Sequence, residues 1–318
     1  MRRIAAALLV PLTAALVLVG CGSSAPPASP NTLVTAQGSF GKAPTVKIPA
    51  QKADGDFYAK TEVQGSGTAL GKNEAFLSNF VLYVWSGTTH KLLLNTYTQT
   101  PQLLYGSLLP GLQKALQGKK MGSRVVAVLP PKDGYGSAGN TELGVTGSDT
   151  LVFVVDMIKA YPATDSASGT QVSNGGAGLP TVTATAGKAP TVTVPTTAPP
   201  SGLVVKTLIK GTGAPVAKGQ YVVTQYVALI WRTRAEFDSS WSRGVPLGFQ
   251  IGATPDQIIP GWNTGLVGVP VGSRVMLVIP PADGYGSSGN SQAGIKGTDT
   301  LVFVVDVLDA VSGASSSG

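Results

Sequence analysis

Residues 122–160 of this chain return as residues 272–310, with every residue 150 positions from its counterpart and no gap. A shorter repeat precedes this one, since GKAPTVKIP at residues 41–49 returns as GKAPTVTVP at residues 187–195. A period this long indicates a duplicated domain and not a solenoid, whose repeats have periods of about 20–50 residues. We therefore predict two domains, one over residues 41–161 and one over residues 187–311.

The composition of each unit favours short strands and turns over long helices. Only 12% of the residues are charged, whereas Gly numbers 41 and Pro 23. Apolar runs of β type occupy residues 221–231, 275–279 and 301–305, while residues 257–266 suit at most one or two helical turns. The expected fold class is α+β, in which a bent antiparallel β half-barrel wraps one short α-helix in each domain.

The N-terminus has the features of an export signal. Arg2 and Arg3 precede an apolar stretch over residues 4–19, which predicts a secretory signal peptide over residues 1–20. The ending LVGC at residues 18–21 resembles the lipobox of bacterial lipoproteins. That resemblance implies a lipidated Cys21 and anchoring to the outer face of the cytoplasmic membrane, in the cell envelope. An ordinary signal peptide with an incidental cysteine is the alternative.

Three further segments are predicted to be flexible. Residues 21–40 are rich in Pro, Ser and Ala, residues 162–186 in Thr, Ser, Gly and Ala, and residues 312–318 in Ser and Gly. Segments with so little apolar content do not form a packed core. We predict a tether, a linker that does not require the domains to pack rigidly together, and a disordered tail.

Charge and rare residue types exclude several classes of function. The formal net charge is +7, but Lys and Arg are scattered without a basic cluster, so no nucleic-acid partner is expected. The chain has one His and one Cys, which leaves hydrolase triads and metal sites without support. His90 lies in a polar loop, and no cofactor is expected. Cys21 has no second cysteine with which to form an intramolecular disulfide.

Six separated segments between residues 203 and 310 carry a family resemblance. In chain order these are Tyr226, FDSS at residues 237–240, IIPGW at 258–262, VGS at 271–273, PADGYG at 281–286 and TLVF at 300–303. Their order and spacing are similar to those of FKBP-type peptidyl-prolyl isomerases, the macrolide-binding immunophilins. The resemblance implies a five- or six-stranded antiparallel half-barrel around a short helix, and isomerisation of X–Pro bonds.

Carried over by position, the resemblance also implies an apolar proline pocket. Its substrate-binding residues would be Tyr226, Phe237, Leu247, Ile258, Trp262 and Phe303. Trp262 would form the floor, and Leu247 stands where the family commonly has an aromatic residue. Taken alone, aromatic residues such as Tyr226 and Phe303 also suit an ordinary core.

Three residues are expected to act directly on the substrate or on the pocket. Tyr285 would donate its hydroxyl to the substrate carbonyl, Asp238 would orient the pocket through a bond to Tyr226, and the Ile259 N–H would hold the chain after the proline. The barrier to rotation of an X–Pro amide, about 18–20 kcal/mol, comes from resonance in the C–N bond. An apolar pocket favours the twisted amide, which is less polar than the planar one, so neither a nucleophile nor a metal is needed.

Two classes of function stay open at this point. The first is an exported isomerase that acts on X–Pro segments of unfolded or folding proteins, with macrolides as further ligands implied by the family. The second is a surface-anchored peptide-binding module or holdase with little turnover.

The first unit departs from the family pattern. Aligning Trp85 with Trp231 places Phe80 at the Tyr226 position, residues 94–95 (Leu-Asn) at the Phe237-Asp238 positions, and Leu112 at the Trp262 position. Tyr135 and Phe153 keep the types of Tyr285 and Phe303. We expect the first domain to be a folded but catalytically poor copy.

Overall fold

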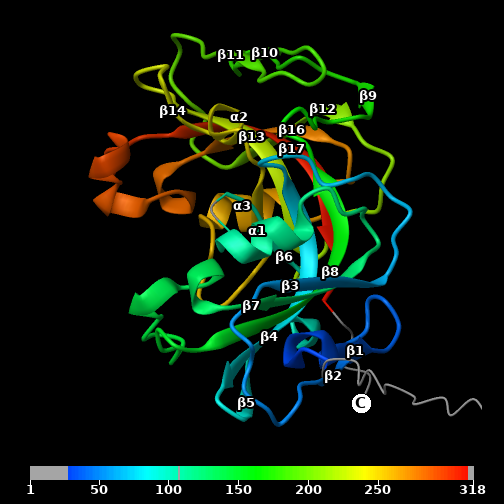
Figure 1. The fold of residues 1–318 in the computed structure, drawn as a ribbon. Coiled ribbons are helices and arrows are strands. Elements are labelled where there is room, and N and C mark those ends of the chain that lie inside the picture. Colours follow the sequence, from blue (N-terminus) through cyan, green and yellow to red (C-terminus); the bar gives the residue numbers. More distant parts are fainter. Residues whose placement is uncertain (1–27, 107, 314–318) are drawn as a thin grey trace, which may run out of the picture.

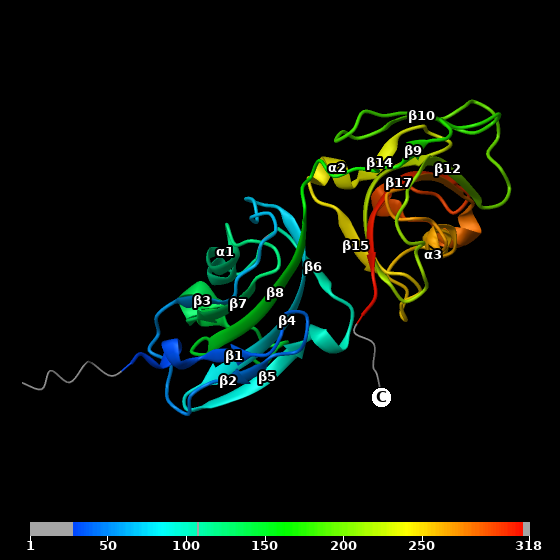
Figure 2. The same cartoon turned by 90° about the vertical axis from the view of Figure 1, so that its right-hand side faces the viewer.

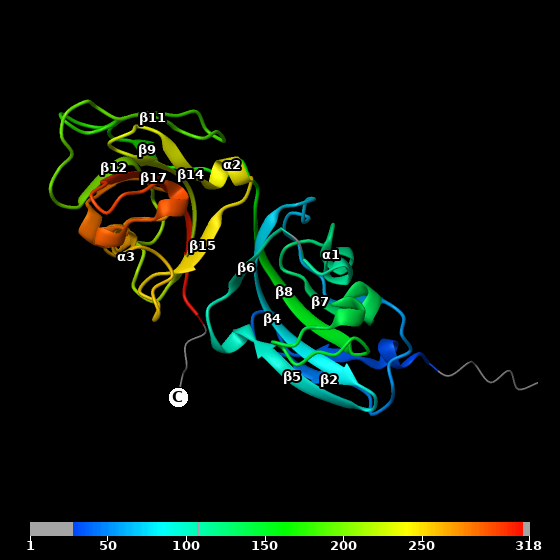
Figure 3. The same cartoon turned by 90° about the vertical axis from the view of Figure 1, so that its left-hand side faces the viewer.

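The computed structural model describes residues 28–106 and 108–313, which form two domains of one architecture (Figures 1, 2 and 3). In the first domain, an antiparallel sheet has the order β3-β7-β8-β4-β5, with β6 beside β4. Its strands are β3 (Tyr58–Val63), β4 (Ala75–Ser86), β5 (Thr89–Asn95), β6 (Gln102–Leu104), β7 (Arg124–Leu129) and β8 (Thr150–Tyr161). The α+β fold class is therefore confirmed, with six strands around one short helix, α1 (Pro110–Leu116).

The second domain repeats this sheet with one additional strand. The order is β14-β13-β17-β16-β12-β9, and β15 pairs with β13. The strands are β9 (Thr170–Gln171), β12 (Val204–Lys210), β13 (Tyr221–Ile230), β14 (Glu236–Ser239), β15 (Leu247–Gln250), β16 (Arg274–Ile279) and β17 (Leu301–Val311). A short helix, α2 (Ser240–Arg243), follows β14, and α3 (Pro260–Leu266) lies against the sheet. Figures 2 and 3 show the two equivalent helices, α1 and α3, in separate domains.

Glycines allow α3 to approach the sheet closely. A Cβ at Gly261 would lie 2.7 Å from Ile279 Cγ2, and a Cβ at Gly265 would lie 2.9 Å from Leu277 Cδ2. Pro260 occupies the first turn of the helix, where its missing N–H has no intrahelical acceptor to lose. This close contact places Trp262 in the apolar core of the second domain, where it is 2% exposed.

A two-stranded hairpin accompanies each domain, and its segment covers the face of the sheet opposite the helix. The hairpins are β1 (Thr35–Gln37) with β2 (Thr45–Lys47), and β10 (Thr181–Thr183) with β11 (Thr191–Thr193). Val34 and Ala36 belong to one buried cluster with Trp85 and strand residues of the first domain, and Val182 and Val194 to the matching cluster with Trp231 in the second. Each domain is thus a sheet with one core on each face.

The predictions of a flexible tether and a flexible linker are wrong for the parts that the structure describes. Residues 28–40 pack on the first domain, where Val34 is fully buried. Residues 162–186 bind the second domain: β9 pairs with β12, and Gln225 Nε2 donates to Ala163 O over 3.0 Å. A few valines in each segment suffice because the apolar outer face of the sheet supplies the rest of the core.

A buried ion pair fixes each of these segments to its sheet. Arg124 donates to Asp156 through Nε and Nη2 over 2.7 and 2.8 Å, and Asp156 also accepts from Gly41 N over 2.7 Å. In the second domain Arg274 Nη2 donates to Asp306 over 2.6 Å, and Asp306 accepts from Ala167 N over 3.0 Å. The segments therefore replace water as partners of charges that the sheets bury.

The two domains also share an apolar cluster, so they pack together, which the predicted linker did not require. Its buried residues are Ala75, Leu77, Leu103 and Tyr161 from the first domain, and Tyr221 and Val223 from the second. Leu103 N donates to Tyr221 Oη over 3.3 Å. Figures 2 and 3 show β6 and β15 on the two sides of this junction.

The export signal, Cys21 and residues 314–318 of the predicted tail lie outside the described residues. Within residues 28–106 and 108–313, no helix is long and apolar enough to cross a membrane.

Candidate active site

One pocket of the second domain contains all nine residues that the sequence singled out there. The cavity has a volume of about 450 Å³. Its walls are formed by Tyr226, Phe237, Asp238, Leu247, Asp256, Gln257, Ile258, Ile259, Pro260, Trp262, Tyr285 and Phe303. Asp256 and Gln257, which precede the IIPGW segment, and Pro260 within it were not predicted as site residues. The roles assigned to the nine residues stay predictions.

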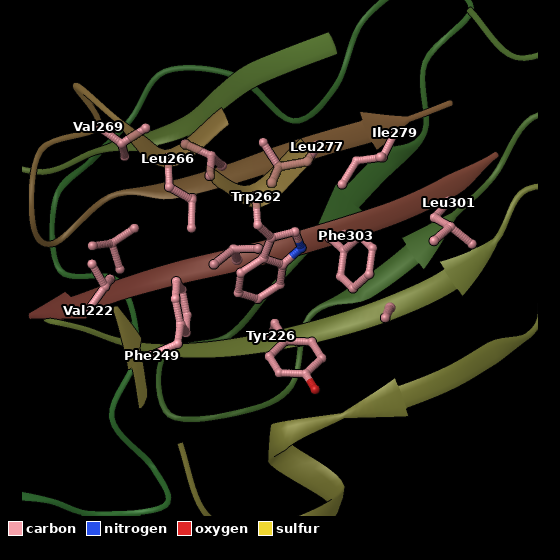
Figure 4. Packing of buried hydrophobic residues seen from close by; sticks show 14 of the residues in the cluster. Val222, Tyr226, Phe249, Trp262, Leu266, Val269, Leu277, Ile279, Leu301 and Phe303 are labelled. Carbon is pink, nitrogen blue, oxygen red and sulfur yellow. The ribbon is translucent and has the colours of Figure 1, made fainter. Parts of the chain in front are cut away.

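An aromatic cluster forms the base of the pocket. Trp262 lies at the N-terminal end of α3, and its ring meets those of Tyr226, Phe249 and Phe303 at centroid distances of 5.2, 5.4 and 5.3 Å, all edge to face. Figure 4 shows Trp262 between these three rings, with its indole nitrogen on the side toward Phe303. The buried Nε1–H of Trp262 has no hydrogen-bond partner among the described residues. The base therefore presents aromatic surface and no strong polar acceptor.

On the wall beside this base, Tyr226, Asp238 and Arg243 form a hydrogen-bonded triad. The Tyr226 hydroxyl donates to Asp238 Oδ2, and Arg243 Nη1 donates to Asp238 Oδ1. Arg243 Nη2 also donates to Tyr226 Oη over 2.9 Å. Burial, followed by the hydrogen bond to Asp238, raises the pKa of Tyr226 above its ordinary value. Tyr226 therefore keeps its proton and positions the carboxylate.

Arg243 was not predicted from the sequence to take part in the site. It lies at the end of α2, five residues after Asp238, and is preceded by the turn that Ser239 caps through a bond from Ser242 N. The only hint of its role in the sequence is a basic residue that closely follows the FDSS segment. Only the turn of α2 brings its guanidinium back over the Tyr226 ring, with Cζ 5.4 Å from the centroid.

Besides the Trp262 N–H at the base, two hydrogen-bond donors are available at the rim of the pocket. Tyr285 is 37% exposed, and burial together with the negative charge of Asp238 raises the pKa of its hydroxyl. Ile259 precedes α3 as its N-cap, and within the described residues its N–H meets no acceptor. A planar amide in the pocket would thus meet apolar rings below and two donors at the rim.

The equivalent place in the first domain is built differently. Strand register makes Phe80 the counterpart of Tyr226, because Phe80 pairs with Val155 and Tyr226 with Val305, 150 positions on. Leu112 in α1 takes the place of Trp262 in α3. Among the described residues, one aromatic pair, Phe80–Phe153, is all that remains of the cluster.

One part of the predicted alignment is wrong by one residue. Leu82 pairs with Leu94, whereas its counterpart Ala228 pairs with Asp238. Leu93 and Leu94, and not residues 94–95, therefore occupy the Phe237 and Asp238 positions. The hydroxyl of Thr96 accepts a hydrogen bond from Phe80 N, just as the hydroxyl of Ser240 accepts one from Tyr226 N. Both sheets have a bulge at this point, which the sequence does not display. The first domain lacks the carboxylate in either alignment.

No group of three or more His, Cys, Asp or Glu side chains suited to a metal ion occurs within residues 28–106 and 108–313. The pocket is an aromatic recess with donors at its rim, and among the described residues no side chain is placed as a nucleophile.

The family profile "FKBP-type peptidyl-prolyl cis-trans isomerase" matches residues 90–158 and 213–308, slightly more than half of the chain. The chain belongs to this family. The two matched segments fall in the two domains, so this FKBP-type protein carries the FKBP fold in tandem.

Two named relatives and one solved structure are similar to parts of this chain. The chain is 41% identical over 119 residues to the FK506-binding protein of Streptomyces anulatus, covering 37% of this chain and 94% of that protein. It is 38% identical over 109 residues to the isomerase FkpA of Escherichia coli, covering 34% of this chain and 38% of that protein. The crystal structure of Escherichia coli FkpA matches 36% of this chain and 49% of that chain, with 38% identity and a TM-score of 0.32. The chain is an FKBP-type peptidyl-prolyl isomerase.

Proposed function

We propose that the second domain carries the isomerase activity of this protein and that the first domain does not. The observation behind this proposal is the difference between the two equivalent recesses. The second has the Trp262 base, the Tyr226–Asp238–Arg243 triad and a cavity of about 450 Å³. The first has leucines at the positions of Trp262, Phe237 and Asp238.

The mechanism that fits this pocket needs no bond to the enzyme. A proline ring seated on Trp262 would place the preceding carbonyl among Tyr226, Phe237 and Phe303, where water is excluded. The carbonyl of a twisted amide has lost resonance and is less polar than that of a planar one, so an apolar wall favours the twisted state. The Tyr285 hydroxyl and the Ile259 N–H would hold the chain on either side of the rotating bond, while Asp238 and Arg243 keep Tyr226 in place.

A matched pair of variants tests which domain is active. Tyr285 and Tyr135 hold the same position in the two copies of the DGYG loop, so Tyr285→Phe and Tyr135→Phe make the same chemical change in each domain. We expect Tyr285→Phe to lower kcat/KM for a short prolyl peptide, and its combination with Trp262→Leu to lower it at least about tenfold. Tyr135→Phe is expected to leave it unchanged. Because truncation of a buried aromatic costs about 3–5 kcal/mol, unfolding by urea must show that the double variant is folded at the assay temperature.

The site of action is proposed from the N-terminal sequence alone. A lipidated Cys21 would keep the isomerase at the outer face of the cytoplasmic membrane, where exported chains with X–Pro bonds fold. One acyl chain gives marginal membrane binding, so stable anchoring needs more than one chain on this residue. Expression of Cys21→Ser in the native host, followed by membrane fractionation, tests this. Release of the protein or retention of its leader is expected, and unchanged retention of mature protein in the membrane fraction would refute the anchor.

A further inference from the structure

A second cavity, of about 660 Å³, lies between the two domains. Its ten lining residues are Thr98, Gln99, Thr100 and Gln102 from the first domain, and Gly219, Tyr221, Gly248, Gln250, Gln257 and Gly313 from the second. We call it the interdomain groove. It falls within the size range of ligand pockets, about 300–1,000 Å³.

The groove is neutral and rich in side-chain amides. Four of its ten lining residues are glutamines and two are threonines, and none carries a charge. Amides and hydroxyls both donate and accept hydrogen bonds. This chemistry matches the alternating N–H and C=O groups of an extended peptide backbone, and it selects for no side-chain charge.

The interdomain groove adjoins the proline pocket. Gln257 lines both cavities, and its Oε1 accepts from Gln250 N over 2.9 Å, which leaves its amide N–H groups as donors. Strand β15 separates the two spaces, since Leu247 faces the proline pocket while Gly248 and Gln250 face the groove. Successive residues of a strand point to opposite faces, so a chain that passes the edge of β15 goes from one cavity to the other.

Gly248 allows the Tyr221 ring to pack closely against β15 on the wall of the groove. A Cβ at this position would lie 2.4 Å from Tyr221 Oη. The Tyr221 hydroxyl accepts from Leu103 N, a bond that ties β6 of the first domain to this wall. The buried cluster of Leu103, Tyr161 and Tyr221 holds the two sides of the groove together. The first domain thus supplies one wall of a site next to the pocket of the second.

We propose that the interdomain groove binds the extended polypeptide on one side of the proline that occupies the pocket, through contacts with the peptide backbone. The first domain then acts as a substrate-binding wall, and the groove gives the protein a preference for long unfolded chains over short prolyl peptides. This inference rests on the proposed function, because the proline pocket of the second domain anchors the chain.

The test compares peptides of two lengths on the full chain. One is a blocked prolyl tetrapeptide, which fills the pocket alone. The others are extended, before or after the proline, by about eight uncharged residues, which add roughly 26 Å of extended chain. Turnover is followed by a protease-free isomerisation assay, and binding by fluorescence anisotropy of labelled peptide.

Two groove variants avoid the proline pocket and the packed interface. Gln99→Ala removes an exposed side chain of the first domain, and Gln250→Ala removes a half-buried one on the wall formed by the second. Gln64→Ala, an exposed glutamine of the first domain outside the groove, is the matched control. Because each lost hydrogen bond weakens binding several-fold, the Gln99→Ala, Gln250→Ala double variant should bind one of the long peptides about tenfold more weakly. Its kcat/KM for the tetrapeptide should stay within twofold of the parent value, as should all values of the control.

The outcomes separate this inference from the function on which it rests. If the double variant binds the long peptides as tightly as the parent and turns over the tetrapeptide normally, the proposed role of the groove is refuted. The proposed isomerase activity of the second domain is then unaffected. Equal losses for the tetrapeptide and the long peptides would also overturn it, because the variants would then act through the pocket. Absence of tetrapeptide turnover in the parent protein would refute the proposed active domain, and groove-dependent binding of the long peptide would still support the groove.

Discussion

Lys159 and Asp309 hold the same position in the two copies of the domain, 150 residues apart, and they form an ion pair with each other across the domain junction. Lys159 Nζ lies 2.7 Å from Asp309 Oδ2, which also accepts from the Tyr161 hydroxyl over 2.8 Å. Lys159 pairs with Leu77 in the first sheet, and Asp309 pairs with the equivalent Val223 in the second. The junction therefore resembles an isologous dimer interface within one chain, in which equivalent strand ends face each other.

The ion pair itself is expected to contribute little to the stability of the junction. The Lys159 side chain is 51% exposed, and exposed ion pairs contribute about 0.2–1 kcal/mol. A double-mutant cycle with Lys159→Ala and Asp309→Ala, measured by urea unfolding, should give a coupling free energy in this range. Asp309→Ala should cost more than Lys159→Ala, because it also leaves the buried Tyr161 hydroxyl without an acceptor. A coupling well above 2 kcal/mol would contradict this assignment.

Arg243 is expected to affect activity through the position of Tyr226 and Asp238. Arg243→Gln removes the donors to both residues, which leaves the Asp238 carboxylate held by Tyr226 alone. The Arg243 and Asp238 side chains are 42% and 39% exposed, and exposed ion pairs contribute about 0.2–1 kcal/mol, so we expect kcat/KM for a short prolyl peptide to fall about two- to fivefold. Arg232→Gln, in the same domain but bonded to Asp299, serves as the control and should retain the parent rate. Equal activity of the two variants would show that Arg243 does not position Tyr226 and Asp238.

The activity should be insensitive to pH until the alkaline range. Tyr285 can donate a hydrogen bond only while its hydroxyl is protonated, and burial and the Asp238 charge raise its pKa above the ordinary value of about 10. A raised pKa keeps the proton on at higher pH, so kcat/KM should be level through neutral pH and decline only above about pH 10. In Asp238→Asn the repelling charge is absent, so any residual activity should begin to decline at lower pH. A decline in the parent enzyme near pH 8 would contradict the role of Tyr285 as donor.

Two of the ion pairs in the second domain are expected to differ strongly in their effect on stability. The Arg274 and Asp306 side chains are 4% and 2% exposed, whereas the Arg232 side chain is 45% exposed. Asp306→Asn leaves the Arg274 charge buried and unpaired, which should lower the free energy of unfolding by about 3–5 kcal/mol. Arg232→Gln leaves Asp299, which is 1% exposed, with its hydrogen bond from Lys296 N, so it should cost less than Asp306→Asn. Urea unfolding followed by fluorescence of the tryptophans measures both, and similar costs would show that the burial of Asp306 does not decide its contribution.

A further effect of pH on stability follows from Asp299. Its hydrogen bond from Arg232 lowers the pKa of this carboxyl below its ordinary value of about 3.9. A lowered pKa in the folded state stabilises the protein above the unfolded-state pKa, and this stabilisation is lost as the pH falls through the folded-state pKa. Stability should therefore drop below about pH 4, and by less in Arg232→Gln than in the parent. If the free energy of unfolding falls equally in both proteins at acid pH, other carboxylates are responsible for the loss.

Several features of this protein follow from the sequence by itself. The repeat at a spacing of 150 residues shows that a domain is duplicated. Apolar runs of β type predict the strands observed as β13, β16 and β17. The pocket residues could be predicted because the family's motifs are local: FDSS, IIPGW and DGYG each place their side chains through a strand end, a helix start or a turn. Leu112 in place of Trp262 could also be predicted, because the two helices align without a gap.

Tertiary structure decided the features that depend on contacts between distant segments. Residues 162–186 have too few apolar side chains to pack alone, and they are ordered because the outer face of the second sheet and Asp306 bind them. The register of β4 with β5 changes at a bulge, so Leu94 and not Asn95 takes the place of Asp238. Arg243 reaches Asp238 only through the turn of α2, and the interdomain groove exists only because Tyr221 and Leu103 meet. Local sequence specifies which residues form strands and turns, whereas the free energy of burying surface between segments specifies which of them meet.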